Sequence, residues 1–138
     1  MRHRAVVDTN VVHAGLYSDS VASHRVLRLI EGGRITPVLS TTLLFEYEEV
    51  LKRNRAMLGL TSREVEDVLD GLCVQGECRR VHFLWRPTLS DPKDDHILEL
   101  AVAAGSADVV THNVRDFAGA SAFGVRVITP AELLGELK

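Results

Sequence analysis

Residues 4–15 read RAVVDTNVVHAG, and this stretch determines how the rest of the chain is interpreted. Its apolar run Ala5-Val6-Val7 is typical of a buried strand, and the run ends at the carboxylate of Asp8. An unpaired carboxylate costs several kcal/mol to remove from water. We therefore expect Asp8 to lie at the mouth of a core strand, with a positive partner nearby.

The rest of the chain alternates short apolar runs with helical patterns. The expected strands cover residues 5–7, 36–39, 79–84, 108–111 and 125–128. The expected helices cover residues 21–31, 42–57, 61–72, 91–104 and the segment after 129. Strands that alternate with helices favour parallel βαβ units. We predict an α/β fold, a three-layer α/β/α sandwich whose central, mostly parallel sheet has four to five strands, in a single domain over residues 1–138.

Composition is typical of an ordinary globular protein. The 138 residues are 46% hydrophobic and 25% charged, without an apolar stretch long enough for a membrane span or a visible secretory signal. We therefore expect a cytoplasmic protein with no membrane partner. The net charge of -3 means that the whole molecule does not attract nucleic acid, although basic residues bunch at 52–55 and 79–80. Cys73 and Cys78 lack a second pair for a zinc site, and we expect two reduced thiols.

Oxygen-bearing side chains follow each of the first four expected strands. In parallel sheets the ligand site lies outside the carboxyl ends of the strands, so these residues should meet at one edge. The candidates are Asp8, Glu46, Asp91, Asp94, Asp95, Asn113 and Asp116.

Among the glutamates of the second expected helix, Glu46 is the preferred candidate. Glu48 precedes Lys52 by four residues and Glu49 precedes Arg53 by four, so both can form favourable ion pairs along the helix. Glu46 has an apolar residue at that spacing and lacks a local counter-charge.

We use the word corner for the connection between an expected strand and the helix that follows it. At the third corner, the three acids differ in their structural roles. Asp91 suits the N-cap position before Pro92, and Asp94 complements the helix dipole in the first turn. Asp95 has no comparable duty and is the preferred chemical candidate. Asp94 stays in reserve, because the choice between neighbours depends on the rotation of the helix.

Crowded carboxylates raise each other's pKa, and a divalent cation removes that penalty. Oxygen donors without cysteine or a histidine pair suit Mg²⁺ or Mn²⁺. Such ions activate water for phosphodiester hydrolysis. The sequence has no phosphate-binding loop, dinucleotide fingerprint or serine nucleophile elbow. A phosphatase or a DNA nuclease using the same cation chemistry stays open.

Four segments together resemble the PIN-domain family, most closely a branch of toxin components of toxin–antitoxin systems that are relatives of the VapC toxins. They are VVDTNVV at 6–12, LSTTLLFEYEEVL at 39–51, DPKDDHILELAVAAGSADVVTHNVRDF at 91–117 and GVRVITPAELL at 124–134. The resemblance implies a Mg²⁺- or Mn²⁺-dependent endoribonuclease that acts on single-stranded RNA. It also implies a homodimer and a small antitoxin partner.

The resemblance also implies roles for individual residues. The metal-binding and catalytic acids would be Asp8, Glu46, Asp95 and Asp116. The supporting polar groups would be Asn10, Thr9, Thr111, Asn113 and Asp94.

The chain departs from this pattern after the fourth strand. Many members of the branch carry Thr-Gly-Asp there, whereas this chain has Thr111-His112-Asn113. The lost acid leads us to expect one bound metal ion. It also leaves an alternative open, a catalytically weak or inactive PIN fold that binds RNA or a protein.

Overall fold

The computed structural model describes residues 3–18, 21–81, 89 and 91–137. At its centre is a five-stranded sheet in the order β3-β2-β1-β4-β5, and every neighbouring pair is parallel. The strands are β1 (His3–Val7), β2 (Ile35–Leu39), β3 (Glu77–Cys78), β4 (Asp108–Val110) and β5 (Val127–Ile128). The predicted α/β fold with a parallel central sheet is therefore confirmed.

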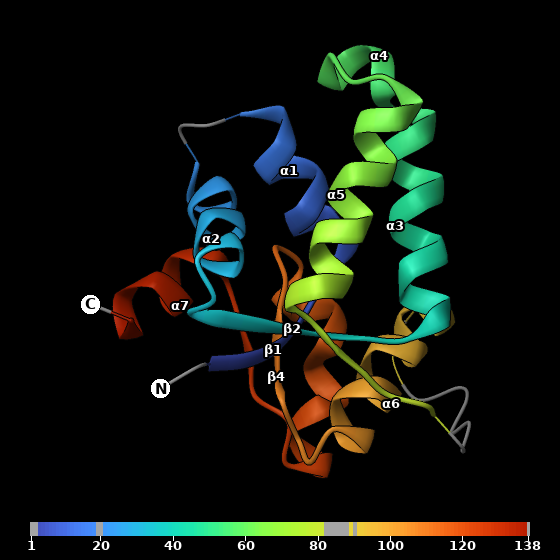
Figure 1. The fold of residues 1–138 in the computed structure, drawn as a ribbon. Helices are drawn as coiled ribbons and strands as arrows, with labels where there is room; N and C mark the ends of the chain where they lie inside the picture. The colour runs from blue at the N-terminus through green and yellow to red at the C-terminus, as the bar shows by residue number, and fades with distance from the viewer. Residues whose placement is uncertain (1–2, 19–20, 82–88, 90, 138) are drawn as a thin grey trace.

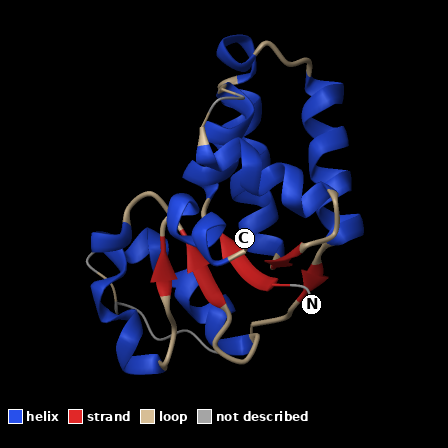
Figure 2. Ribbon diagram, turned by 90° about the vertical axis from the view of Figure 1, so that its left-hand side faces the viewer, coloured by secondary structure: helices blue, strands red, loops and turns tan. Residues whose placement is uncertain are grey.

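Helices cover both faces of the sheet (Figures 1 and 2). In Figure 1 the upper face is covered by α1 (Thr9–Tyr17), α2 (Ala22–Glu31), α3 (Thr41–Arg53) and α5 (Ser62–Gln75). The lower face is covered by α6 (Asp95–Ala103) and the 3₁₀ segment η2 (Val114–Phe123). The remaining elements are α4 (Arg55–Leu58), the 3₁₀ turn η1 (Pro92–Asp94) and α7 (Pro130–Glu136), which packs against α2.

The core lies between these layers. Because both faces of a parallel sheet are covered, its strands need continuous apolar runs, and Ala5, Val6 and Val7 of β1 are fully buried as a result. The lower layer adds Ile97, Leu98, Leu100 and Ala101 of α6. Among the described helices, none combines the length and apolar character that crossing a membrane requires.

Two helix starts follow the sequence signals. Thr61 and Thr129 each form a capping box, in which the threonine and a glutamate three residues later satisfy each other's backbone N–H groups. These boxes begin α5 and α7 at the predicted places.

The third strand begins earlier than expected. The sequence predicts a strand over residues 79–84, whereas β3 covers Glu77–Cys78, and residues 82–84 lie outside the described part of the chain. Gly76, the C-cap of α5, directly precedes β3 and packs tightly, since a Cβ there would lie 2.6 Å from the Leu39 side chain and 2.6 Å from the Leu72 carbonyl oxygen. The chain therefore enters the sheet directly after α5.

The helices show three further differences from the sequence prediction. The expected helix over 42–57 is divided into α3 and α4 at Asn54, whose side-chain amide donates to the Val50 carbonyl at 2.7 Å. The segments α1 and η2 were not predicted. In α1 the β-branched valines and Gly15 have low helix propensity, but Gly15 allows close packing on α2, with a Cβ position only 2.6 Å from the Leu27 side chain.

Candidate active site

The central strand β1 lies between β2 and β4. The strand order therefore runs outward from β1 in both directions, through β2 to β3 on one side and through β4 to β5 on the other. Ligand sites of open α/β sheets form at such switch points. Asp8 directly follows β1 and Thr111 directly follows β4, and the backbone N–H of Asp8 donates to the Val110 carbonyl at 2.9 Å. Both side chains therefore lie at the switch point.

Asp8 is 7% exposed, and its Oδ2 accepts a hydrogen bond of 2.7 Å from the buried Thr111 hydroxyl. The sequence led us to expect a positive partner near Asp8, which stays a prediction; the side chain that bonds to it among the described residues is the neutral Thr111 hydroxyl. Burial raises the pKa of Asp8, the Thr111 hydrogen bond opposes this, and the charge of Glu46 raises the pKa further. The Asp8 carboxylate is thus held in place by Thr111, and the negative charge of Glu46 lies close enough to act on it.

Glu46 reaches the same edge from α3. Its Oε2 accepts a hydrogen bond from the Thr9 hydroxyl, and its Oε1 lies 3.2 Å from Nε2 of His96 on α6. Burial raises the pKa of Glu46, but the hydrogen bonds from His96 and Thr9 outweigh it, and the net shift is downward. Tyr47 donates to the Val7 carbonyl and fixes α3 against β1.

The neighbours of Glu46 pair as the sequence predicts. Nζ of Lys52 lies 3.1 Å from the Glu48 carboxylate, and Nη1 of Arg53 lies 3.3 Å from the Glu49 carboxylate. These ion pairs turn both glutamates along the helix surface and leave Glu46 to face the sheet edge.

The third corner separates Asp94 from Asp95. Asp95 is 1% exposed, and its Oδ1 accepts a hydrogen bond of 2.8 Å from the backbone N–H of Leu89. Asp94 is partly exposed, and its pKa is raised to about 6 by burial first and then by the charges of Asp8, Asp91, Asp116 and Glu46.

This separation follows from how the helix starts. Pro92–Asp94 forms a 3₁₀ turn with Asp91 as its N-cap, as the sequence indicated for Asp91, and the regular helix α6 begins only at Asp95. Asp94 consequently faces the other acids, and Asp95 points into the protein.

The fourth corner adds Asp116 and a polar network. Asp116 lies in the first turn of η2, where its N–H donates to the Asn113 carbonyl at 2.9 Å, and its charge reaches Asp94. The backbone N–H of Asn113 donates to the Thr111 hydroxyl oxygen at 3.0 Å. Asn10 donates to the same oxygen at 3.4 Å.

One connection of this network was missed by the sequence analysis. The side chain of Asn10 accepts from the backbone N–H of His112 at 3.3 Å, and the His112 ring lies 2.7 Å from the hydroxyl of the fully buried Ser23. Ser23 and His112 are 89 residues apart, and no local pattern marks them as partners. The contact ties α2 to the loop after β4.

We define the acid cluster as Asp8, Glu46, Asp94 and Asp116. Its donors are all oxygens, the set that Mg²⁺ and Mn²⁺ prefer, and the pKa of Asp94 is raised first by burial and then by repulsion from the other acids and from Asp91. Yet within the described residues no three His, Cys, Asp or Glu side chains converge closely enough to hold a metal ion. The chemistry and charge of the acid cluster fit a divalent cation, and its side chains would have to turn inward to coordinate one.

The comparison with known families agrees with this architecture. The sequence profile of the PIN domain matches residues 4–115, which include all of β1 except His3, the strands β2 to β4 and three acids of the cluster. The chain therefore belongs to the PIN domain family, whose members are generally nucleases. A search of curated proteins found no match.

Proposed function

We propose that the protein is a Mg²⁺- or Mn²⁺-dependent endoribonuclease that hydrolyses phosphodiester bonds of single-stranded RNA. The observation that carries this proposal is the geometry at the sheet edge, where the Asp8 carboxylate accepts from the Thr111 hydroxyl and the Glu46 carboxylate accepts from the hydroxyl of Thr9, the residue next to Asp8. Burial, and then the charges of the surrounding acids, raise the pKa of Asp94, which agrees with a gathering of acids there. Membership of a family of nucleases supports it.

The acid cluster would hold the cation, with Asp94 taking the place for which the sequence favoured Asp95. A bound Mg²⁺ or Mn²⁺ lowers the pKa of a coordinated water and stabilises charge on phosphate oxygens. Thr111 orients Asp8, while Thr9 and His96 orient Glu46 and keep it ionised. Asp95 supports the site from behind, because its bond to the Leu89 N–H fixes the start of α6.

A cleavage assay on a fluorescently labelled single-stranded RNA, with Mn²⁺ or with EDTA, tests the proposal. Asp8→Asn should abolish cleavage while the far-ultraviolet circular dichroism stays unchanged. The matched control Asp67→Asn removes an acid of α5 whose side chain is 63% exposed, and it should cleave like the wild type. Full activity of Asp8→Asn would refute the assignment.

The same assay distinguishes the two neighbouring acids of the third corner. Asp94→Asn should lose cleavage and keep its fold, whereas Asp95→Asn should lower the melting temperature because a buried hydrogen bond is weakened. The opposite pattern would restore Asp95 as the metal ligand.

The second candidate function is a catalytically weak or inactive PIN fold that binds RNA or a protein. Two observations favour it: among the described residues no three His, Cys, Asp or Glu side chains converge on a metal position, and Asn113 stands where many members of the toxin branch that the sequence resembles carry an acid. Calorimetric titration with Mn²⁺ separates the two functions, because absence of binding would support the inactive module.

We extend the proposal to the toxin of a type II toxin–antitoxin pair, acting as a homodimer and inhibited by a small antitoxin. Several large apolar side chains of the helices are exposed, which supports a protein partner that would cover them. They include Tyr17, Phe45, Met57 and Val74. Induced expression should arrest growth, and Asp8→Asn should relieve the arrest. Light scattering after gel filtration measures the oligomeric state, and a monomer would contradict the dimer.

A further inference from the structure

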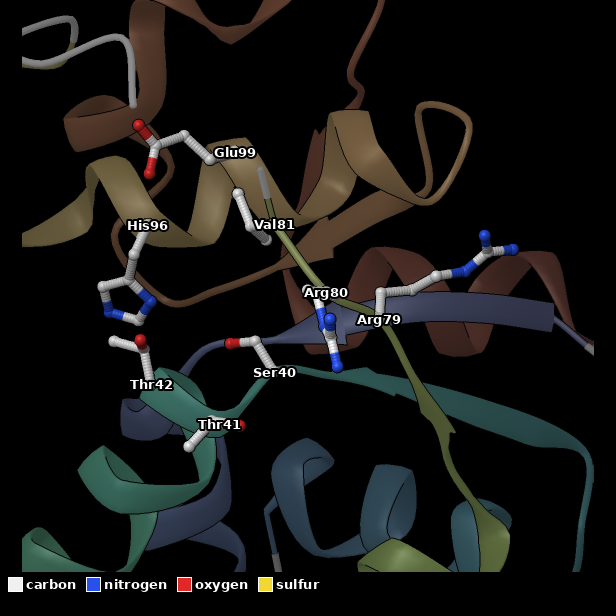
Figure 3. A pocket seen from close by; sticks show the side chains of 8 residues that line it. All are labelled: Ser40, Thr41, Thr42, Arg79, Arg80, Val81, His96 and Glu99. Carbon is white, nitrogen blue, oxygen red and sulfur yellow. The ribbon is translucent and has the colours of Figure 1, made fainter. Parts of the chain in front are cut away.

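A polar pocket lies beside the acid cluster. It is a cavity of about 230 Å³ between the start of α3, the segment after β3, and α6 (Figure 3). Its lining residues are Ser40, Thr41, Thr42, Arg79, Arg80, Val81, His96 and Glu99. We call this cavity the arginine pocket.

Backbone pairing places the two arginines. The N–H of Arg79 donates to the Leu39 carbonyl at 2.8 Å and so extends the β2–β3 ladder beyond Cys78. Arg80 follows beside the start of α3, as Figure 3 shows. The Arg79 side chain is 46% exposed and lies 2.5 Å from Glu77, while Arg80 forms no ion pair with any residue that the structure describes.

Neutral donors face these cations. Ser40 is the N-cap of α3 and accepts from the Leu43 N–H at 3.1 Å, and the hydroxyls of Thr41 and Thr42 follow it along the pocket wall. The first turn of α3 has no acidic residue. The positive end of the helix dipole therefore adds to the two guanidinium groups.

His96 connects the arginine pocket to the acid cluster. Its Nε2 lies 3.2 Å from Glu46, and its Nδ1 has no hydrogen-bond partner among the described residues. Thr42 and Glu46 are four residues apart in α3, about one turn or roughly 6 Å along the axis. The two sites thus lie next to each other on one helix.

One acid also lines the pocket. Glu99 is only 1% exposed, and Figure 3 shows its carboxylate directed away from Arg80. Among the lining residues, Arg79 and Arg80 thus carry two positive charges against the one acid Glu99.

We propose that the arginine pocket binds a backbone phosphate of single-stranded RNA next to the phosphodiester at the acid cluster. This inference rests on the proposed function. Guanidinium groups bind phosphate oxygens through charge-assisted, often bidentate hydrogen bonds, which suits Arg80. Binding one phosphate here would position the neighbouring linkage for cleavage.

The test measures RNA binding separately from cleavage. A fluorescein-labelled single-stranded RNA is titrated with wild type, Arg80→Gln and Arg80→Lys in EDTA, and anisotropy gives Kd at several salt concentrations. Arg80→Gln should raise Kd about tenfold because a hydrogen bond to a charged group is lost. It should also reduce the slope of log Kd against log salt by about 0.7, the value for one single-strand phosphate. The Kd of Arg80→Lys should lie between those of the wild type and Arg80→Gln.

The matched control is Arg63→Gln, which removes an 86% exposed arginine from α5. Equal Kd values for Arg80→Gln and Arg63→Gln would overturn the proposal, as would a wild type that binds no RNA. If the wild type cleaves RNA but the two variants bind equally, only the arginine pocket is refuted. If Arg80→Gln binds weakly but the wild type cleaves nothing, the pocket stands and the proposed nuclease activity fails.

Discussion

Replacing Asp94 with asparagine should stabilise the fold above about pH 6. The pKa of Asp94 is raised from 3.8 to about 6, so its charged form is less favourable in the folded chain than in the unfolded chain. A shift of about 2 units corresponds to about 3 kcal/mol. Because Asp94 is partly exposed, solvent screening reduces this to about 1 kcal/mol.

The sign of the pH dependence follows from proton binding. Between pH 3.8 and about 6 the folded protein binds more protons at Asp94 than the unfolded protein does. Stability therefore falls as the pH rises through this window. The asparagine variant lacks this loss, so its advantage should be absent below pH 3.8 and complete above about 6.

Thermal unfolding followed by circular dichroism, in EDTA at pH 3.5 and pH 7.5, measures the effect. At the higher pH, Asp94→Asn should melt roughly 4 °C above the wild type for a domain of this size. The two should melt together at the lower pH. The Asp94 side chain makes no capping hydrogen bond at the start of α6, so the substitution removes no structural contact of that kind.

Two results would refute this reasoning. One is a variant that melts below the wild type at pH 7.5, which would mean that the carboxylate stabilises the fold. The other is an equal gain at both pH values, which would point to a cause other than charge. The exposed substitution Asp67→Asn controls for the general effect of removing one acid.

Two further predictions concern other contacts. Thr111→Val removes the donor to Asp8 and should lower the free energy of unfolding, measured by urea titration, by about 2 kcal/mol. Thr111→Ser keeps a hydroxyl and should restore most of the lost free energy. An unchanged free energy of unfolding in the valine variant would contradict the role of the hydroxyl. Hydrogen bonds from Arg4 lower the pKa of Glu77 to about 2. Burial opposes this shift, and Arg79 adds to it. Glu77→Gln should therefore cost about 1 kcal/mol above pH 4.5, and this cost should vanish as the pH falls toward 2; a cost independent of pH would exclude the charge as its origin.

The parts of the fold that the sequence predicted are those with strong local signals. Continuous apolar runs marked four of the strands in nearly correct positions, because strands covered on both faces must be apolar throughout. Capping boxes at Thr61 and Thr129 marked two helix starts. In contrast, α1 contains two valines and a glycine of low helix propensity, and its packing against α2 and α3 depends on contacts that a local pattern does not encode.

The candidate site shows the same division. The arrival of Asp8, Glu46 and Asp116 at one edge follows from parallel topology, and the pairing of Glu48 and Glu49 along α3 follows from spacing. The choice between Asp94 and Asp95 depends on whether the first turn is 3₁₀ or α. That difference rotates a side chain by tens of degrees, and the sequence signals of Asp91 as N-cap and Pro92 at the first position are the same for both kinds of turn.

Burying the carboxylates of the acid cluster close together lowers the stability of the fold, and hydrogen bonds to these carboxylates offset this loss only in part. Glu46 receives two hydrogen bonds that lower its pKa, and Asp8 receives one that limits its rise, but Asp94 carries a pKa near 6 without a capping bond. If the cost exists for cation binding, Mn²⁺ should raise the melting temperature of the wild type at pH 7.5 and leave that of Asp94→Asn nearly unchanged. An equal Mn²⁺ response in both proteins would show that Asp94 does not hold the ion, and the third ligand would then have to be sought elsewhere on the same edge.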